Sequence, residues 1–122
     1  EITDGKVKVH RIGCAVDCGR AVNPDISNAR VESSIIFGLS AALWGEINVQ
    51  GGRVQQTNFH DYRVLRIAEV PIIETHLVDS DEPPGGIGEP ATALVAPAVC
   101  NAIYAATKQR LRSLPIARHK LA

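Results

Sequence analysis

The stretch that decides the fold reads NPDISNARVESSIIFGLSAALW and covers residues 23–44. Asn23, Pro24 and Asp25 are typical of an N-cap, a first-turn proline and a first-turn acid, so they predict the start of a helix. Apolar residues then recur at spacings of three and four, at Val31, Ile35, Leu39, Ala42 and Leu43. This spacing predicts a helix that runs to about Trp44 and buries one face.

The middle of this predicted helix contains three poor helix formers, Ser33, Ser34 and Gly38. Small side chains at such positions allow another element to approach closely. We therefore expect packing, rather than intrinsic propensity, to determine the structure there.

A strand is predicted before this helix and a hairpin after it. Residues 7–16 alternate with mixed character on both faces, which favours a strand inside a sheet. Two further alternating runs, 46–50 and 53–57, flank the pair Gly51-Gly52. A Gly-Gly pair between two such runs is typical of a tight β-hairpin.

The last two predicted elements are a strand over residues 72–78 and a helix over about 94–108, with Pro97 in its first turn. The order of strand, helix, hairpin, strand and helix indicates an α+β fold. In that fold two helices pack on a largely antiparallel sheet that contains the hairpin. No internal boundary is visible, so residues 1–122 are predicted to form a single domain.

Composition limits the classes of partner. A chain of 122 residues can bury about two thirds of its unfolded surface, so it needs no metal or disulfide to fold. The 13 basic and 13 acidic residues balance, and the basic end after Glu89 has no interleaved aromatic residues, so no nucleic-acid partner is expected. No apolar run of about 18 residues occurs, so no membrane span is predicted.

The cysteines and histidines indicate no metal site. Cys14 and Cys18 lie four residues apart in a predicted strand, which separates their Cα atoms by about 13 Å. A disulfide tolerates at most about 7 Å, so Cys14, Cys18 and Cys100 are predicted to be structural thiols. The four histidines are too scattered to form a ligand motif.

One loop presents a single carboxylate, and it reads PPGGIGEP at residues 83–90. Glycines allow a ligand to approach the backbone, and the proline after Glu89 favours an extended conformation for that residue. Residues 86–91 also fit a dinucleotide-binding fingerprint in a formal sense. That fold requires an acidic residue about 20 positions further on, and no acid follows Glu89, so a dinucleotide site is not favoured.

Four motifs in one order resemble a known family. They are CAVDCGRAVNP at 14–24, IIFGL at 35–39, NFHDYR at 58–63 and GGIGEP at 85–90. Together they resemble the C-terminal part of the molybdopterin-binding large subunit of the xanthine dehydrogenase and aldehyde oxidase family, in particular the beta subunit of isoquinoline 1-oxidoreductase and its bacterial relatives. Those relatives usually carry glycine or another small residue directly after a glutamate of this helix, whereas in this chain Glu32 is followed by Ser33 and Ser34.

The resemblance implies an enzyme, a molybdenum hydroxylase that inserts a water-derived oxygen into a carbon–hydrogen bond of an aldehyde or N-heterocycle. It implies that Glu89 is the catalytic general base and that Gly86, Ile87 and Gly88 lie against the molybdopterin cofactor. The family holds its metal through the pterin, so no side-chain ligand is expected. For Asn58, Asp61 and Tyr62 we expect a structural tie between hairpin and sheet, and for Arg20 and Asn23 a role in stabilising a turn.

The resemblance also implies partners, namely the remainder of the large subunit and a small iron–sulfur subunit. Such a subunit is several times longer than this chain, so the isolated chain is expected to be inactive. The alternative is an inert stand-alone fragment or an assembly domain, which would self-associate through its exposed apolar surface. The sequence leaves open the substrate and the compartment, whether bacterial cytoplasm or periplasm.

Overall fold

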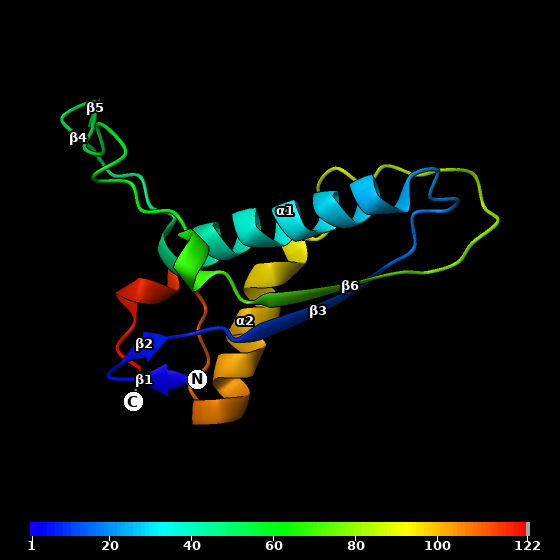
Figure 1. Cartoon of the computed structure of the whole chain (residues 1–122). Coiled ribbons are helices and arrows are strands. Elements are labelled where there is room, and N and C mark those ends of the chain that lie inside the picture. The colour runs from blue at the N-terminus through cyan, green and yellow to red at the C-terminus, as the bar shows by residue number, and fades with distance from the viewer. Residues whose placement is uncertain (122) are drawn as a thin grey trace.

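Two crossing helices and a pair of strands form the body of the protein (Figure 1). The computed structural model describes residues 1–121. Helix α1, Pro24–Trp44, lies against helix α2, Thr92–Thr107, and also contacts strand β6, Ile72–Leu77. Strand β3, Arg11–Val16, pairs with β6. The predicted α+β class is confirmed, with both predicted helices present.

The strands form three separate pairs. β1, Ile2–Thr3, and β2, Lys6–Val7, are antiparallel, as are β4, Val49–Gln50, and β5, Arg53–Val54. The longest pair, β3 and β6, is parallel, from Arg11 opposite Ile72 to Val16 opposite Leu77. Two short 3-10 helices, η1 at Ile67–Glu69 and η2 at Ile116–Arg118, complete the fold.

The buried faces of the two helices supply most of the core. Every apolar residue that predicted the buried face of α1 is buried, and α2 adds Val95, Val99 and Ile103. Leu111, Ile116 and Leu121 close the core from the C-terminal segment. Leu39 retains only 1% of its accessible surface, whereas Phe37 on the opposite face of α1 retains 70%.

The expected close packing in the middle of α1 is confirmed at Gly38 and Ser34, which are both buried, while Ser33 is exposed. A Cβ atom on Gly38 would lie 2.7 Å from the carbonyl oxygen of Thr92. The Thr92 hydroxyl donates a 3.2 Å hydrogen bond to the carbonyl of Ser34. The first turn of α2 is therefore seated directly on the middle of α1.

The start of α1 is also as predicted. Asn23 is the N-cap, and its side-chain oxygen accepts a 3.1 Å hydrogen bond from the backbone N–H of Ile26. Pro24 occupies the first helical position, where its missing N–H costs nothing.

Three local predictions differ from the structure. The strand expected over residues 7–16 is divided into β2 and β3, because residues 2–7 fold back as their own antiparallel pair. The sheet under the helices was predicted to be largely antiparallel, but β3 and β6 are parallel because α1 and the hairpin carry the chain back to the same end. Pro97 lies beyond the first turn of α2, since that helix begins earlier than predicted, at Thr92.

The β4–β5 hairpin projects from the body as an arm (Figure 1). It lies where the sequence predicted it, and Gly51 and Gly52 adopt the positive φ values that its turn requires, 57° and 77°.

Neither helix within residues 1–121 combines the length and the apolar character that a membrane span requires.

Candidate functional site

The glycine loop at residues 83–90 connects the end of β6 to the start of α2. In Figure 1 the connection runs out beyond the end of the β3–β6 pair and then returns to α2. Glu89, Gly86 and Gly88 are exposed in this loop, and Ile87 is half-buried. Ile87 packs against the edge of the hydrophobic core, so the loop is attached to the body at its centre.

The turn formed by Asp17–Arg20 holds the first half of this connection. The backbone N–H of Gly85 donates to the carbonyl of Cys18 at 2.8 Å, and the N–H of Arg20 donates to the carbonyl of Glu82 at 2.9 Å. The Arg20 guanidinium also lies 3.7 Å from the carboxylate of Asp81. Two segments more than sixty residues apart in the sequence are therefore joined at the loop, and Arg20, which we expected to stabilise a turn, takes part in this join.

The second half of the connection is held by the start of α2. The backbone N–H of Thr92 donates to the carbonyl of Glu89 at 3.0 Å, and Ala91, which caps the helix, is only 3% exposed. Because Thr92 is itself fixed on α1, the backbone of Glu89 is anchored to the two-helix core. Its carboxylate nevertheless lies on the exposed side of the chain.

The glycines of the loop have space around them. A Cβ atom on Gly86 or Gly88 would meet nothing within 4 Å, so contacts inside this chain do not require glycine at either position. Within residues 1–121, the backbone N–H groups of Gly86, Ile87 and Gly88 donate to no protein acceptor. The loop therefore offers a row of free donors that a polar ligand can approach closely.

The described residues contain no group of three or more His, Cys, Asp or Glu side chains that could hold a metal ion. Cys14, Cys18 and Cys100 are all free thiols, and Cys18 is buried in the turn beside the glycine loop. The chemistry offered by the loop is therefore that of one carboxylate and several backbone donors.

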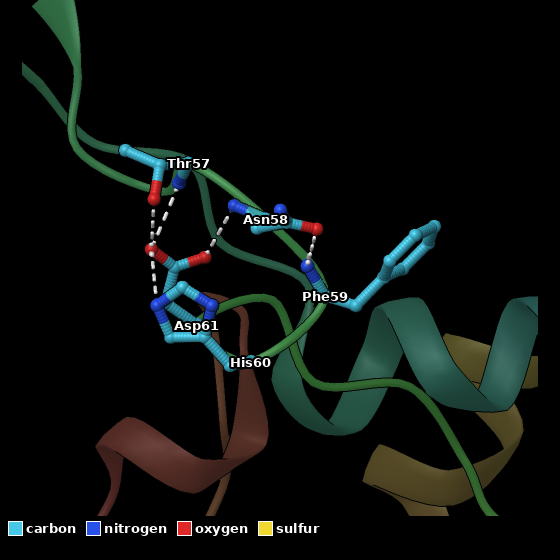
Figure 2. Close-up of polar contacts among 5 residues, drawn as sticks. All are labelled: Thr57, Asn58, Phe59, His60 and Asp61. Carbon is cyan, nitrogen blue, oxygen red and sulfur yellow. Dashed lines mark hydrogen bonds and ion pairs between the residues drawn. The ribbon is translucent and has the colours of Figure 1, made fainter.

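A second ordered cluster lies at the base of the hairpin arm. The Asp61 carboxylate accepts hydrogen bonds from the Thr57 N–H at 2.8 Å, the Thr57 hydroxyl at 3.0 Å and the Asn58 N–H at 2.9 Å (Figure 2). The Asn58 side chain in turn accepts from the Phe59 N–H at 2.8 Å. These bonds stay within one loop, so Asn58 and Asp61 do not tie the hairpin to the sheet as we expected.

This cluster has two consequences. The backbone donors of Asn58 and Thr57 stabilise the charged carboxylate and lower the pKa of Asp61 to about 2. The same ordered loop directs the Phe59 side chain away from the protein, where it is 96% exposed (Figure 2). Sequence reasoning missed Phe59 because an aromatic residue in a polar loop gives no periodic signal.

Sequence reasoning also missed Gly19, although it singled out the surrounding motif. Gly19 has a φ of +67°, and a Cβ atom there would lie 2.2 Å from the carbonyl oxygen of Pro83. The Asp17-Cys18-Gly19 sequence is a recognisable turn signal, but the segment that the turn contacts comes from the other end of the chain.

Comparison with known proteins identifies the family. A family model described as "Molybdopterin cofactor-binding domain" matches residues 1–71. The isoquinoline 1-oxidoreductase subunit beta of Brevundimonas diminuta is 42% identical over 93% of this chain. The chain belongs to the molybdopterin cofactor-binding domain family. The resemblance expected from the sequence is thereby confirmed, and molybdopterin is the cofactor of this family.

Further similarities extend across the family. The xanthine dehydrogenase molybdenum-binding subunit of Escherichia coli O157:H7 is 30% identical over 95% of this chain and 16% of its own length. Among solved structures, a Cu,Mo-CO dehydrogenase has a TM-score of 0.82 at 25% identity, covering 93% of this chain and 15% of that protein. The chain also spans only 15% of the Brevundimonas subunit.

We predict that Asp61 titrates far below an ordinary aspartate in the folded protein. Because the folded pKa is depressed, the stabilisation is present above the unfolded pKa, which is near 3.8, and is lost as the pH falls toward about 2. An NMR titration of the carboxyl carbons measures this directly. A midpoint for Asp61 near the ordinary aspartate value would contradict the hydrogen-bonded arrangement.

Proposed function

We propose that this chain is the C-terminal cofactor-binding domain of a molybdenum hydroxylase that oxidises an aldehyde or N-heteroaromatic carbon–hydrogen bond with water-derived oxygen. The observation that carries the proposal is the exposed carboxylate of Glu89 in an open glycine loop. Hydrogen bonds hold this loop at both ends, and the chain is a member of the molybdopterin-binding family. When bound, the molybdenum cofactor supplies the two-electron redox chemistry.

Glu89 acts in this proposal as the general base. General-base catalysis requires a carboxylate within about 2.6–3.2 Å of the proton that it accepts. Glu89 is the only acidic residue from 83 to 121, and its backbone is anchored through Thr92 while its side chain remains accessible. These two features support a role for Glu89 in accepting the proton of the attacking water-derived hydroxyl.

Gly86, Ile87 and Gly88 form the contact with the cofactor in this proposal. Their free N–H groups suit the polar atoms of a pterin or its phosphate, and the two glycines leave room for it. Ile87 anchors the centre of the loop on the core. The residues present therefore fit the cofactor that the family binds.

The remainder of the large subunit is the partner that this surface requires. Relatives are several times longer than the chain, which spans 15% of the Brevundimonas subunit. A groove of about 520 Å³ lies between residues 7–13 and α2, and it is lined largely by aliphatic side chains. We propose that the remainder of the same subunit covers this groove and the hairpin arm, and that a small iron–sulfur subunit removes the electrons.

The arm supports this assignment because its apolar side chains are largely exposed. Ile47, Val49, Val54 and Phe59 are all exposed, and β4 and β5 contact mainly each other. Val49 and Val54 lie directly opposite one another across the hairpin. A projecting hairpin with an exposed aromatic residue near its base is typical of an interface that becomes buried on assembly.

A second candidate function is that of an inert fragment or assembly domain without catalysis, and the same exposed apolar surface favours it. Molybdenum and pterin analysis of the purified chain and of the complete subunit distinguishes the two candidate functions. We expect no stoichiometric molybdenum in the chain alone and full loading in the complete subunit, because one loop offers too few contacts to retain the cofactor. A complete subunit that never takes up molybdenum would support the non-catalytic function.

We predict that Glu89→Gln in the complete enzyme lowers turnover by about 10²–10⁴-fold or more, because the amide cannot accept the proton. Molybdenum content should be unchanged. Glu82→Gln is the matched control, since Glu82 is an exposed glutamate of the same connection that bonds only through its backbone, to Arg20 and Ser80. Near-normal turnover of Glu89→Gln would refute the assignment of the base.

The partner assignment predicts an effect of Phe59→Ala that depends on context. In the isolated chain the unfolding temperature should not change, because the ring is 96% exposed. In the complete subunit the same substitution should lower it, because a buried aromatic contact is lost. Arg112→Ala, an exposed change outside the arm and the groove, should be neutral in both proteins. Equal unfolding temperatures of wild type and Phe59→Ala in the complete subunit would exclude this docking surface.

A further inference from the structure

We infer that the Asp17–Arg20 turn is a clamp that positions Glu89, and that Gly19 is its key residue. The inference rests on the proposed function, because it assigns to a distant segment the placement of the proposed base. It also assigns a role to residues 17–20 of the motif at 14–24, which the proposed function does not use.

The contact at Gly19 is the closest approach in the clamp. A Cβ atom at this position would lie 2.2 Å from the carbonyl oxygen of Pro83 and 2.8 Å from that of Glu82. Gly19 is buried and has a φ of +67°, a conformation that L side chains rarely adopt. A side chain at this position would therefore displace the loop, and the backbone conformation disfavours one as well.

Backbone hydrogen bonds on both sides of Gly19 complete the clamp. Cys18 accepts from Gly85 and Arg20 donates to Glu82, so the turn holds two points of the loop at once. The turn itself is fixed by the Asp17 carboxylate, which accepts a 3.0 Å hydrogen bond from the Gly19 N–H.

The clamp shortens the part of the connection that no hydrogen bond holds. Val78 is bonded to Val16 at one end of the connection and Glu89 is bonded to Thr92 at the other, so without the clamp only the packing of Ile87 on the core would hold residues 79–88. With the clamp in place, only residues 86–88 remain between the anchored Gly85 and Glu89. Two of these are glycines, the residues with the most conformational freedom to lose. Shortening the free segment therefore limits the positions available to Glu89.

The test compares Gly19→Ala with Gly5→Ala in the complete, molybdenum-loaded enzyme. Both glycines have positive φ, +67° and +71°, but a Cβ atom on Gly5 would make only an ordinary contact, 3.4 Å from the carbonyl oxygen of Leu121, so Gly5→Ala controls for backbone strain. We expect Gly19→Ala to lower kcat by about 10²-fold, the effect of a displacement of about 1 Å in a catalytic group, with the substrate KM and molybdenum content retained. Gly5→Ala should leave kcat unchanged.

A second readout does not depend on activity. Amide hydrogen exchange at residues 86–88, relative to the core of α1, should be faster in Gly19→Ala than in Gly5→Ala. Should Gly19→Ala not fold, Asp17→Ala removes only the hydrogen bond to the Gly19 N–H, and Asp17→Asn, which keeps an acceptor oxygen, should restore slow exchange and kcat.

The outcomes distinguish this inference from the proposed function. If Glu89→Gln abolishes turnover but Gly19→Ala behaves like Gly5→Ala in kcat and exchange, the clamp is refuted and the base stands. If Glu89→Gln retains turnover, the proposed function is refuted. In that case faster exchange confined to Gly19→Ala still supports the clamp as the device that orders the loop, and equal exchange overturns it.

Discussion

The structure depends on the contact between Gly38 of α1 and the first turn of α2. Only a residue without a side chain admits the Thr92 carbonyl at this distance, and the Thr92 hydroxyl then bonds to Ser34. This contact brings the buried faces of the two helices together. It also sets the position of everything just before α2, so the crossing that closes the core determines where Glu89 lies.

The glycine loop is consequently held from two independent directions. Its end follows from the helix crossing, and its beginning follows from the Asp17–Arg20 turn, which emerges from β3. Since β3 and β6 are parallel, both strands end at the same edge, and the turn after one meets the connection after the other. An open loop with fixed ends is a physically reasonable way to present one carboxylate while leaving the backbone donors of Gly86 and Gly88 free.

Local signals in the sequence predicted the elements well, but not how they pair. Asn23 and Pro24 define the start of α1, and the pair Gly51-Gly52 locates the hairpin, because capping and turn chemistry act within a few residues. The parallel pairing of β3 with β6 and the contact of Gly19 with Pro83 each join segments about sixty residues apart, and no local pattern encodes them. Glu89 was identified as a candidate from its glycine-rich surroundings, while the turn that holds its loop became visible only in three dimensions.

The central claim is that this loop presents Glu89 to the molybdenum cofactor of a larger subunit. The most direct measurement is the structure of that complete subunit with its cofactor bound. The account predicts that the Glu89 carboxylate faces the substrate cavity within about 2.6–3.2 Å of the hydroxyl whose proton it accepts, with Gly86 and Gly88 against the cofactor. A Glu89 side chain that instead points to bulk solvent, or that pairs with a cationic side chain away from the cofactor, would contradict it.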